Sequence, residues 1–99
     1  MRRAAKVDAN QPEIVAALRK AGATVQYLNQ QGDDCPDLLV GYQAQNFVIE
    51  VKMPGGKLKP GQRVWMEGWK GQACVAHTAE EALLSIGPIN FQRTTRRST

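Results

Sequence analysis

Residues 36–52 read PDLLVGYQAQNFVIEVK, and this stretch decides the fold of the 99-residue chain. Two runs rich in β-branched and other apolar side chains, 36–42 and 46–52, flank a short polar break. The pattern predicts two strands joined by a tight turn. An antiparallel hairpin of this kind would bring Asp37, at the start of the first strand, close to Glu50 in the second.

The second strand of this hairpin is expected to have one apolar and one charged face, because successive side chains of a strand point to opposite faces. The expected core face consists of Phe47, Ile49, Val51 and Met53. The opposite face carries Val48, Glu50 and Lys52. Two acids and a lysine facing one pocket are unfavourable unless a cation neutralises the carboxylates. This arrangement is the main indication of function.

The rest of the chain predicts three helices and two further strands. The helices are expected over 10–22, 60–70 and 78–87, and the strands over 23–28 and 72–76. Asn10 suits the N-cap of the first helix and Gly22 its end, while Thr78 and Glu81 form a capping box before the last helix. A helix precedes the last strand, so this strand is expected to lie parallel to the hairpin. The predicted fold is α/β, a mixed β-sheet flanked by helices in the order α-β-β-β-α-β-α.

Composition and charge are those of a small globular domain that favours a polyanionic partner. Hydrophobic residues make up 42% of the chain and charged residues 22%, and the net charge is +4. A chain of this length buries a core with little margin, so dimerisation would help. Basic residues gather near both ends, which predicts a basic tail (1–9), one domain (10–87) and a second basic tail (88–99). The tails either contact phosphate or are solvated.

The cysteines and the hydropathy pattern indicate the compartment. Cys35 and Cys74 lack metal-ligand spacing and are expected to be free thiols of a reducing cytosol. The basic N-terminus is not followed by the apolar segment of a signal peptide, and no apolar run reaches the length of a membrane span. We therefore expect a soluble cytoplasmic protein without a membrane partner, in a bacterial host cell if the chain comes from a phage.

The charged residues of the hairpin resemble a known signature. Asp37 follows Pro36, Glu50 comes thirteen residues later, and Lys52 two residues after that. This pattern resembles the signature of the PD-(D/E)XK nuclease superfamily. Residues 56–65 read GKLKPGQRVW, similar to the Gly-Lys-Leu-x-Pro-x-Gln-x-x-Trp segment of its VRR-NUC family, the virus-type replication-repair nucleases. The resemblance covers residues 10–87, most of the chain.

This resemblance implies a restriction-endonuclease-like core and hydrolysis of DNA phosphodiester bonds with Mg²⁺ or Mn²⁺. The residues that it assigns to the site are Asp37 and Glu50 as metal ligands, the Val51 carbonyl as a further ligand, Lys52 as the motif lysine, Glu13 as the helix acid and Gln62 as the helix glutamine. Standalone members of viral type resemble Holliday-junction resolvases, which form homodimers and favour branched DNA. The chemistry of the residues agrees, because Mg²⁺ and Mn²⁺ prefer hard oxygen ligands.

The nuclease hypothesis also gives roles to the lysine and arginine side chains near the two acids. Lys52 can donate a hydrogen bond to the attacking water or to a phosphate oxygen, and its charge opposes the developing anion. Lys57, Lys59 and Arg63 are expected to bind the DNA backbone without sequence preference, through counterion release.

Other interpretations of the same residues stay open. Glu13 also suits a surface acid that compensates the helix dipole. Trp65 and Trp69, one helical turn apart, suit core or dimer packing as well as base stacking. Asp37 could be a capping acid, with Glu50 and Lys52 as a surface ion pair. For the whole chain, the alternatives to a nuclease are a catalytically inactive DNA-binding module with the same fold and a domain that binds another partner.

Overall fold

The sheet and the three helices expected from the sequence are present in the computed structural model, which describes residues 7–32 and 34–87. The elements are α1 (Gln11–Lys20), β1 (Thr24–Tyr27), β2 (Leu38–Tyr42), β3 (Gln45–Val51), α2 (Pro60–Gly68), β4 (Gln72–Ala76) and α3 (Ala79–Ile86). The predicted order α-β-β-β-α-β-α is therefore confirmed. Most of the two predicted basic tails lies outside the described residues, including Arg2, Arg3, Lys6, Arg93, Arg96 and Arg97.

The central hairpin is confirmed as well. β2 and β3 pair antiparallel, with Leu38 opposite Ile49 and Tyr42 opposite Gln45. Gln43 and Ala44 form the turn between the strands, and both have positive φ, 50° and 64°. Two positive φ values at the centre of a two-residue turn are typical of type I′, whose twist matches that of the strands it joins.

The four strands form one mixed sheet in the order β1-β2-β3-β4. β1 pairs antiparallel with β2, whereas β4 runs parallel to β3, with Val51 opposite Ala76. The parallel pair confirms the prediction for the last strand. Parallel neighbours need a long crossover connection, and α2 with its flanking loops supplies it.

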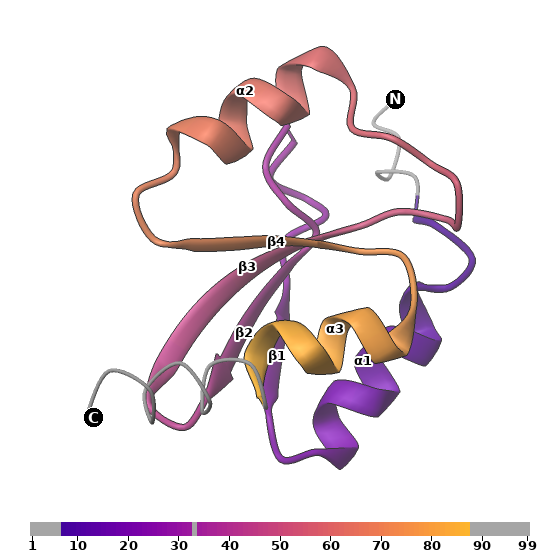
Figure 1. The fold of residues 1–99 in the computed structure, drawn as a ribbon, viewed down its shortest axis with the longest axis vertical. Coiled ribbons are helices and arrows are strands. Elements are labelled where there is room, and N and C mark those ends of the chain that lie inside the picture. The colour runs from indigo at the N-terminus through magenta and orange to yellow at the C-terminus, as the bar shows by residue number, and fades with distance from the viewer. Residues whose placement is uncertain (1–6, 33, 88–99) are drawn as a thin grey trace, which may run out of the picture.

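The hydrophobic core lies between the sheet and two of the helices. α1 and α3 lie next to each other on one side of the sheet (Figure 1). The core residues include Ile14, Val15 and Leu18 of α1, Leu38 and Val40 of β2, Phe47, Ile49 and Val51 of β3, and Ala82 and Ile86 of α3. The prediction for Met53 was wrong, because β3 ends at Val51 and the Met53 side chain is 43% exposed.

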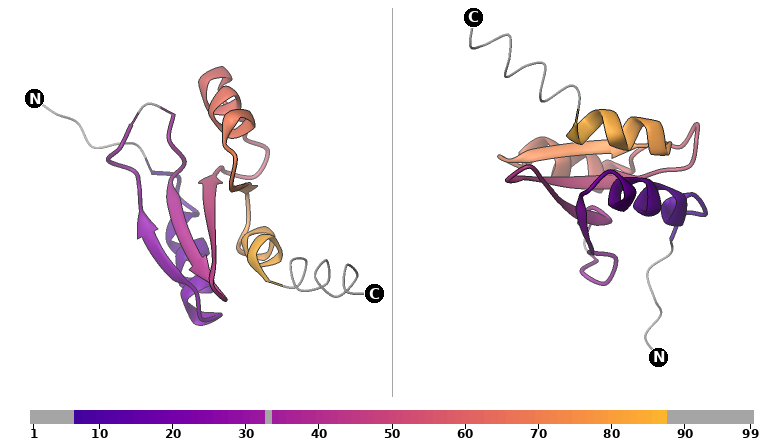
Figure 2. Two further views of the ribbon diagram at one scale, coloured as in Figure 1. Left: turned by 90° about the vertical axis from the view of Figure 1, so that its left-hand side faces the viewer. Right: turned by 90° about the horizontal axis from the view of Figure 1, so that it is seen from below.

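α2 lies on the other side of the sheet from α1 and α3 (Figure 1). In the left view of Figure 2, β4 runs between α2 and α3. None of the residues of α2 is fully buried. Trp65 stacks on Trp69, which follows the helix, with ring centroids 4.6 Å apart and an interplanar angle of 13°. The two tryptophans thus pack on each other and leave much of α2 exposed.

The helix starts are fixed by contacts that the sequence predicted only in part. Thr78 Oγ1 accepts a hydrogen bond from the Glu81 amide, which confirms Thr78 as the N-cap of α3. The predicted capping box is formed only in this half, because the Glu81 carboxylate accepts from the His77 amide and not from the Thr78 amide. Asn10 is the N-cap residue of α1 by position, but its side chain makes no cap hydrogen bond. Its Nδ2 instead donates to the carbonyl oxygens of Lys52 and His77.

Two further predictions concern the whole described part of the chain. Cys35 and Cys74 are not joined by a disulfide, as predicted. Within residues 7–32 and 34–87, no helix has both the length and the apolar character needed to cross a membrane.

Candidate active site

Asp37 and Glu50 lie opposite each other at one end of the central hairpin. The β2–β3 register pairs Leu38 with Ile49, and continuing it by one residue sets Asp37 opposite Glu50. The Asp37 Oδ2 atom accepts a hydrogen bond of 2.9 Å from the Val51 amide, and the Asp37 carboxylate is close enough to Glu50 for its charge to raise the Glu50 pKa. The hairpin therefore brings the two acids together, as the sequence predicted.

The two carboxyl groups are held where charge is unfavourable. Glu50 is only 4% exposed. Burial raises the pKa of Glu50 from 4.5 to about 7, the charge of Asp37 adds to this increase, and Lys52 opposes it. Burial also raises the pKa of Asp37, against the hydrogen bond from the Val51 amide. Two carboxylates in one buried pocket favour a bound proton or cation, because the like charges repel and water is excluded.

Lys52 supplies one positive charge to this pocket. Its Nζ lies 3.6 Å from Glu50 Oε2, and its side chain is 13% exposed. The Lys52 amide donates to the Ala76 carbonyl, so the main chain of Lys52 is still tied to β4 after β3 has ended. The ammonium group is therefore fixed beside the acids from the strand that carries Glu50.

Gln62 connects α2 to the acidic pair. Its Nε2 donates to Glu50 Oε2 over 3.3 Å, and its Oε1 accepts from the Lys59 amide at the start of α2 over 2.9 Å. One side chain thus holds the first turn of the helix and orients the Glu50 carboxylate. The hydrogen bond to Glu50 supports the predicted association of Gln62 with the site.

Three polar residues that sequence reasoning did not assign to the site also belong to its surroundings. Asn29 Nδ2 donates to Asp37 Oδ1 over 2.9 Å, and Gln11 Nε2 donates to Asn29 Oδ1 over 3.0 Å. The charge of Asp8, at the end of the predicted N-terminal tail, adds to the rise in pKa of both acids. A signal for Gln11 exists in the sequence: it precedes Ile14, Val15 and Leu18 at helical spacing, so it falls on the buried stripe.

The remaining predicted residues lie farther out. Glu13 is exposed on α1, and none of the hydrogen bonds or ion pairs found among the described residues connects it to Asp37 or Glu50. Lys57, Lys59 and Arg63 are exposed along the start of α2 and the segment before it. The Val51 amide faces Asp37, and the role of the Val51 carbonyl as a metal ligand stays a prediction.

The donor set at this site fits Mg²⁺ or Mn²⁺ better than a metal that needs a full protein cage. No group of three or more His, Cys, Asp or Glu side chains that could hold a metal ion occurs within residues 7–32 and 34–87. Mg²⁺ keeps several waters and is commonly held by one or two carboxylates together with substrate phosphate. Asp37 and Glu50 supply such a pair, and their raised pKa values indicate that a cation there would be stabilising.

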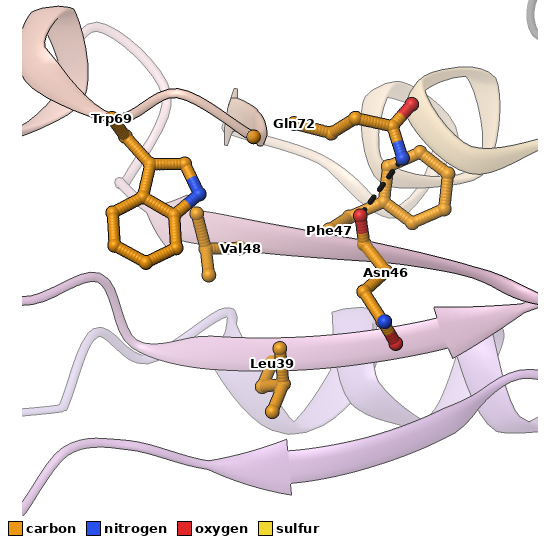
Figure 3. A pocket seen from close by; sticks show the side chains of 7 residues that line it. Leu39, Asn46, Phe47, Val48, Trp69 and Gln72 are labelled. Carbon is orange, nitrogen blue, oxygen red and sulfur yellow. Dashed lines mark hydrogen bonds between the residues drawn. The ribbon is translucent and has the colours of Figure 1, made fainter.

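A shallow apolar pocket lies on the same face of the sheet as Glu50. It is lined by Leu39, Asn46, Phe47, Val48, Trp69, Gly71 and Gln72. Figure 3 shows the Trp69 ring beside Val48, with Leu39 on the neighbouring strand. Gln72 Nε2 donates to the Asn46 carbonyl at the other end of the pocket (Figure 3). Leu39 is 38% and Trp69 47% exposed, so this face carries apolar side chains that solvent reaches.

Comparisons of the chain with protein-family models, with curated proteins and with solved structures gave no match. The functional interpretation therefore depends on the site residues and their geometry.

Proposed function

We propose that this chain is a divalent-metal-dependent DNA endonuclease that hydrolyses phosphodiester bonds, as its resemblance to the VRR-NUC family implies. One observation carries the proposal. Two carboxyl groups with raised pKa values, the half-buried Asp37 and the buried Glu50, lie together with the Lys52 ammonium at the end of one hairpin. A structural ion pair would need one acid, whereas the second acid leaves a negative charge for a metal ion to neutralise.

Each residue of the site has a distinct role in this proposal. Asp37 and Glu50 hold Mg²⁺ or Mn²⁺, with the Val51 carbonyl as a further ligand, and the Gln62 amide keeps the Glu50 carboxylate oriented. The chemistry that such a metal supplies is Lewis-acid stabilisation of charge on the phosphate oxygens. Lys52 donates a hydrogen bond to the attacking water or to a phosphate oxygen and offsets the negative charge that develops. Glu13, the helix acid of the resemblance, is exposed on α1.

The proposed substrate is branched or duplex DNA, with four-way junctions as the preferred form by resemblance. The exposed cations Lys57, Lys59 and Arg63 are next to Gln62 in the sequence, so a DNA backbone bound along them would pass the acidic pair. We further propose a homodimer, because Trp69, Leu39 and Val64 expose apolar surface on the side of the sheet that carries the site. The cytoplasm is the proposed compartment.

The second candidate is a DNA-binding module of the same fold without turnover. The geometry favours the nuclease, because Asp37, Glu50 and Lys52 are all present, with Lys52 paired to Glu50 and the charge of Asp37 acting on Glu50. A protein that only bound DNA would gain from replacing a buried acid pair by neutral residues.

The decisive experiment is a cleavage panel of single-stranded, duplex, flap and four-way DNA with Mg²⁺, Mn²⁺ or EDTA. The wild-type protein should cut only with metal. Lys52→Ala should cut at least about 100-fold more slowly, because a charged donor to the reacting phosphate is lost. Lys70→Ala, which removes an exposed lysine away from the acids, is the matched control and should cut like the wild type. Wild-type cleavage by Lys52→Ala would contradict the mechanism, and DNA binding without cleavage would favour the second candidate.

A further inference from the structure

The start of α1 reaches the candidate site through a chain of side-chain amides. Gln11 is 3% exposed although it is polar. Its Nε2 donates to Asn29 Oδ1 over 3.0 Å, and Asn29 Nδ2 donates to Asp37 Oδ1 over 2.9 Å. Three segments far apart in the sequence, the first turn of α1, the loop after β1 and the start of β2, thus meet in one line of hydrogen bonds.

The direction of this chain is fixed by the carboxylate at its end. An ionised carboxylate only accepts hydrogen bonds, so Asn29 must turn its NH₂ group toward Asp37. The Asn29 carbonyl then faces Gln11, and Gln11 must present its own NH₂ group. This leaves the Gln11 Oε1 atom as the outer end of the chain, where it is buried without a hydrogen-bond partner.

Unsatisfied buried acceptors are rare and unfavourable, and within residues 7–32 and 34–87 those of side chains lie at the start of α1. Among the residues that the structure describes, the buried side-chain polar atoms without a partner are Asn10 Oδ1 and Gln11 Oε1. Both belong to amides whose NH₂ groups point toward the site: Gln11 toward Asp37 through Asn29, and Asn10 toward the Lys52 carbonyl. A methionine or leucine at position 11 would suit this buried stripe and would bring no unsatisfied acceptor of its own, so the amide is explained by its donation to Asn29.

We propose that Gln11 and Asn29 form an amide relay that positions the Asp37 carboxylate for metal binding, an inference that rests on the proposed function. Asn29 holds Oδ1 of Asp37, and the Val51 amide holds Oδ2 over 2.9 Å. With one fixed donor on each oxygen, the plane of the carboxylate is set before a ligand arrives. The remaining lone pairs of both oxygens then point in a defined direction. Gln11 and Asn29 are positioning residues, because they act on the metal only through Asp37.

Two variants test the relay against a purely structural role. Gln11→Met keeps the size of the side chain but removes the donor to Asn29, and Asn29→Leu removes the donor to Asp37 without adding a charge. Both should bind Mn²⁺ 10- to 100-fold more weakly in calorimetry, the range typical for loss of a residue that orients a metal ligand. Gln31→Leu is the control, because it removes an amide without a change of charge at an exposed position of the same loop and should bind like the wild type.

Measurements of thermal stability and of cleavage at saturating Mn²⁺ further distinguish a positioning role of Gln11 from a structural one. Gln11→Met removes the unsatisfied Oε1 acceptor and also the donor to Asn29 Oδ1. These two effects oppose each other, so its thermal midpoint in the metal-free protein should stay close to that of the wild type. DNA cleavage by this variant should return to near the wild-type rate at saturating Mn²⁺, because the substitution lowers only the affinity for the metal. If Gln11→Met lowered stability and saturating metal failed to restore cleavage, Gln11 would be structural and the inference would be overturned.

A metal-free measurement tests the relay without reference to the nuclease. The side-chain NH₂ signals of Asn29 in ¹⁵N NMR spectra should shift in Gln11→Met and in Asp37→Asn, and unchanged signals would disprove the hydrogen-bond chain. If wild-type protein bound no Mn²⁺, the proposed function would fail together with the role of the relay in it. If wild type bound Mn²⁺ and both variants bound it equally well, only the relay would fail.

Discussion

At the scale of single residues, the acidic pair sets the behaviour of the site. The buried Glu50 lies beside the half-buried Asp37, and the charge of Asp37 makes ionisation of Glu50 less favourable. Lys52 offsets one negative charge but leaves the second. The pair can therefore exchange a bound proton for a metal ion, because protons and metal ions compete for the same carboxyl groups. Function and stability are opposed at these residues.

This opposition predicts how stability depends on pH. The pKa of Glu50 is about 7 in the folded protein and 4.5 ordinarily, so between these values the unfolded chain loses its proton first. The free energy of unfolding of the metal-free protein should therefore fall as pH rises from 4.5 to 7, by at most about 3 kcal/mol. Urea titrations across this range would measure it, and Glu50→Gln, which does not titrate, should show a smaller decrease. A rise in stability over this interval, absent from Glu50→Gln, would contradict the assignment.

Bound metal ions should offset the loss of stability that the metal-free protein shows at high pH. Because Mg²⁺ or Mn²⁺ binds the ionised carboxylates, the increase in thermal midpoint on adding Mn²⁺ should be larger at pH 8 than at pH 5.5. Thermal melts with and without Mn²⁺ at both pH values would test this. Glu50→Gln is the control, since it removes one charged ligand and should respond weakly to the metal at either pH. An equal response of the wild type at both pH values would show that the metal binds elsewhere.

At the scale of elements, the β2–β3 hairpin carries strain in its turn. Gln43 and Ala44 both occupy the left-handed region, which L-residues other than Asn, Asp and Gly rarely adopt. The hairpin nevertheless forms, because the buried strands on either side fix the register. The acids at the far end of the hairpin depend on this register, since a slip by one residue would send Asp37 or Glu50 to the opposite face.

Relieving this strain should stabilise the protein. Ala44→Gly is expected to raise the free energy of unfolding by about 0.5–1 kcal/mol, because glycine adopts positive φ without steric penalty. The matched control is Ala16→Gly at an exposed position inside α1, where the same change should lower stability by about 1 kcal/mol. Chemical denaturation of both variants would measure the two values. If Ala44→Gly also destabilised the protein, the turn would not have the conformation described here.

At the scale of the whole molecule, the two faces of the sheet differ. α1 and α3 cover one face and enclose the core, while α2 covers the other only in part (Figure 1). The partly covered face carries the acidic pair, the pocket beside Trp69 and the exposed side chain of Leu39. DNA binding and self-association would therefore use the same side of the protein.

This asymmetry predicts which surface forms the proposed homodimer. Leu39→Asp should convert the dimer to a monomer in sedimentation velocity at micromolar concentration, because it puts a charge into the apolar face beside Trp69. Leu84→Asp makes the same change at a 42% exposed position on α3, on the opposite side, and should leave the dimer intact. A wild-type protein that sediments only as a monomer would remove the dimer from the proposal.

The sequence by itself determined the elements and the central pair of acids. Period-two alternation in residues 46–52, the turn between the strands and the cap at Thr78 are local signals, and each produced the structure it predicted. The contact between Asp37 and Glu50 was also predictable, because a tight hairpin leaves few possible registers.

Only the tertiary structure decided which other residues join the acids. Gln11, Asn29 and Asp37 meet because α1 packs across the sheet, and no pattern within one element encodes that contact. Helical periodicity places Gln11 on the buried face of α1 and Glu13 outside it, but the partner of a buried amide depends on a loop 18 residues away. Likewise, β3 ends at Val51, so Met53 lies in solvent although strand alternation assigned it to the core. Periodicity acts over neighbouring residues, whereas the surroundings of a buried charge are set by segments that meet only on folding.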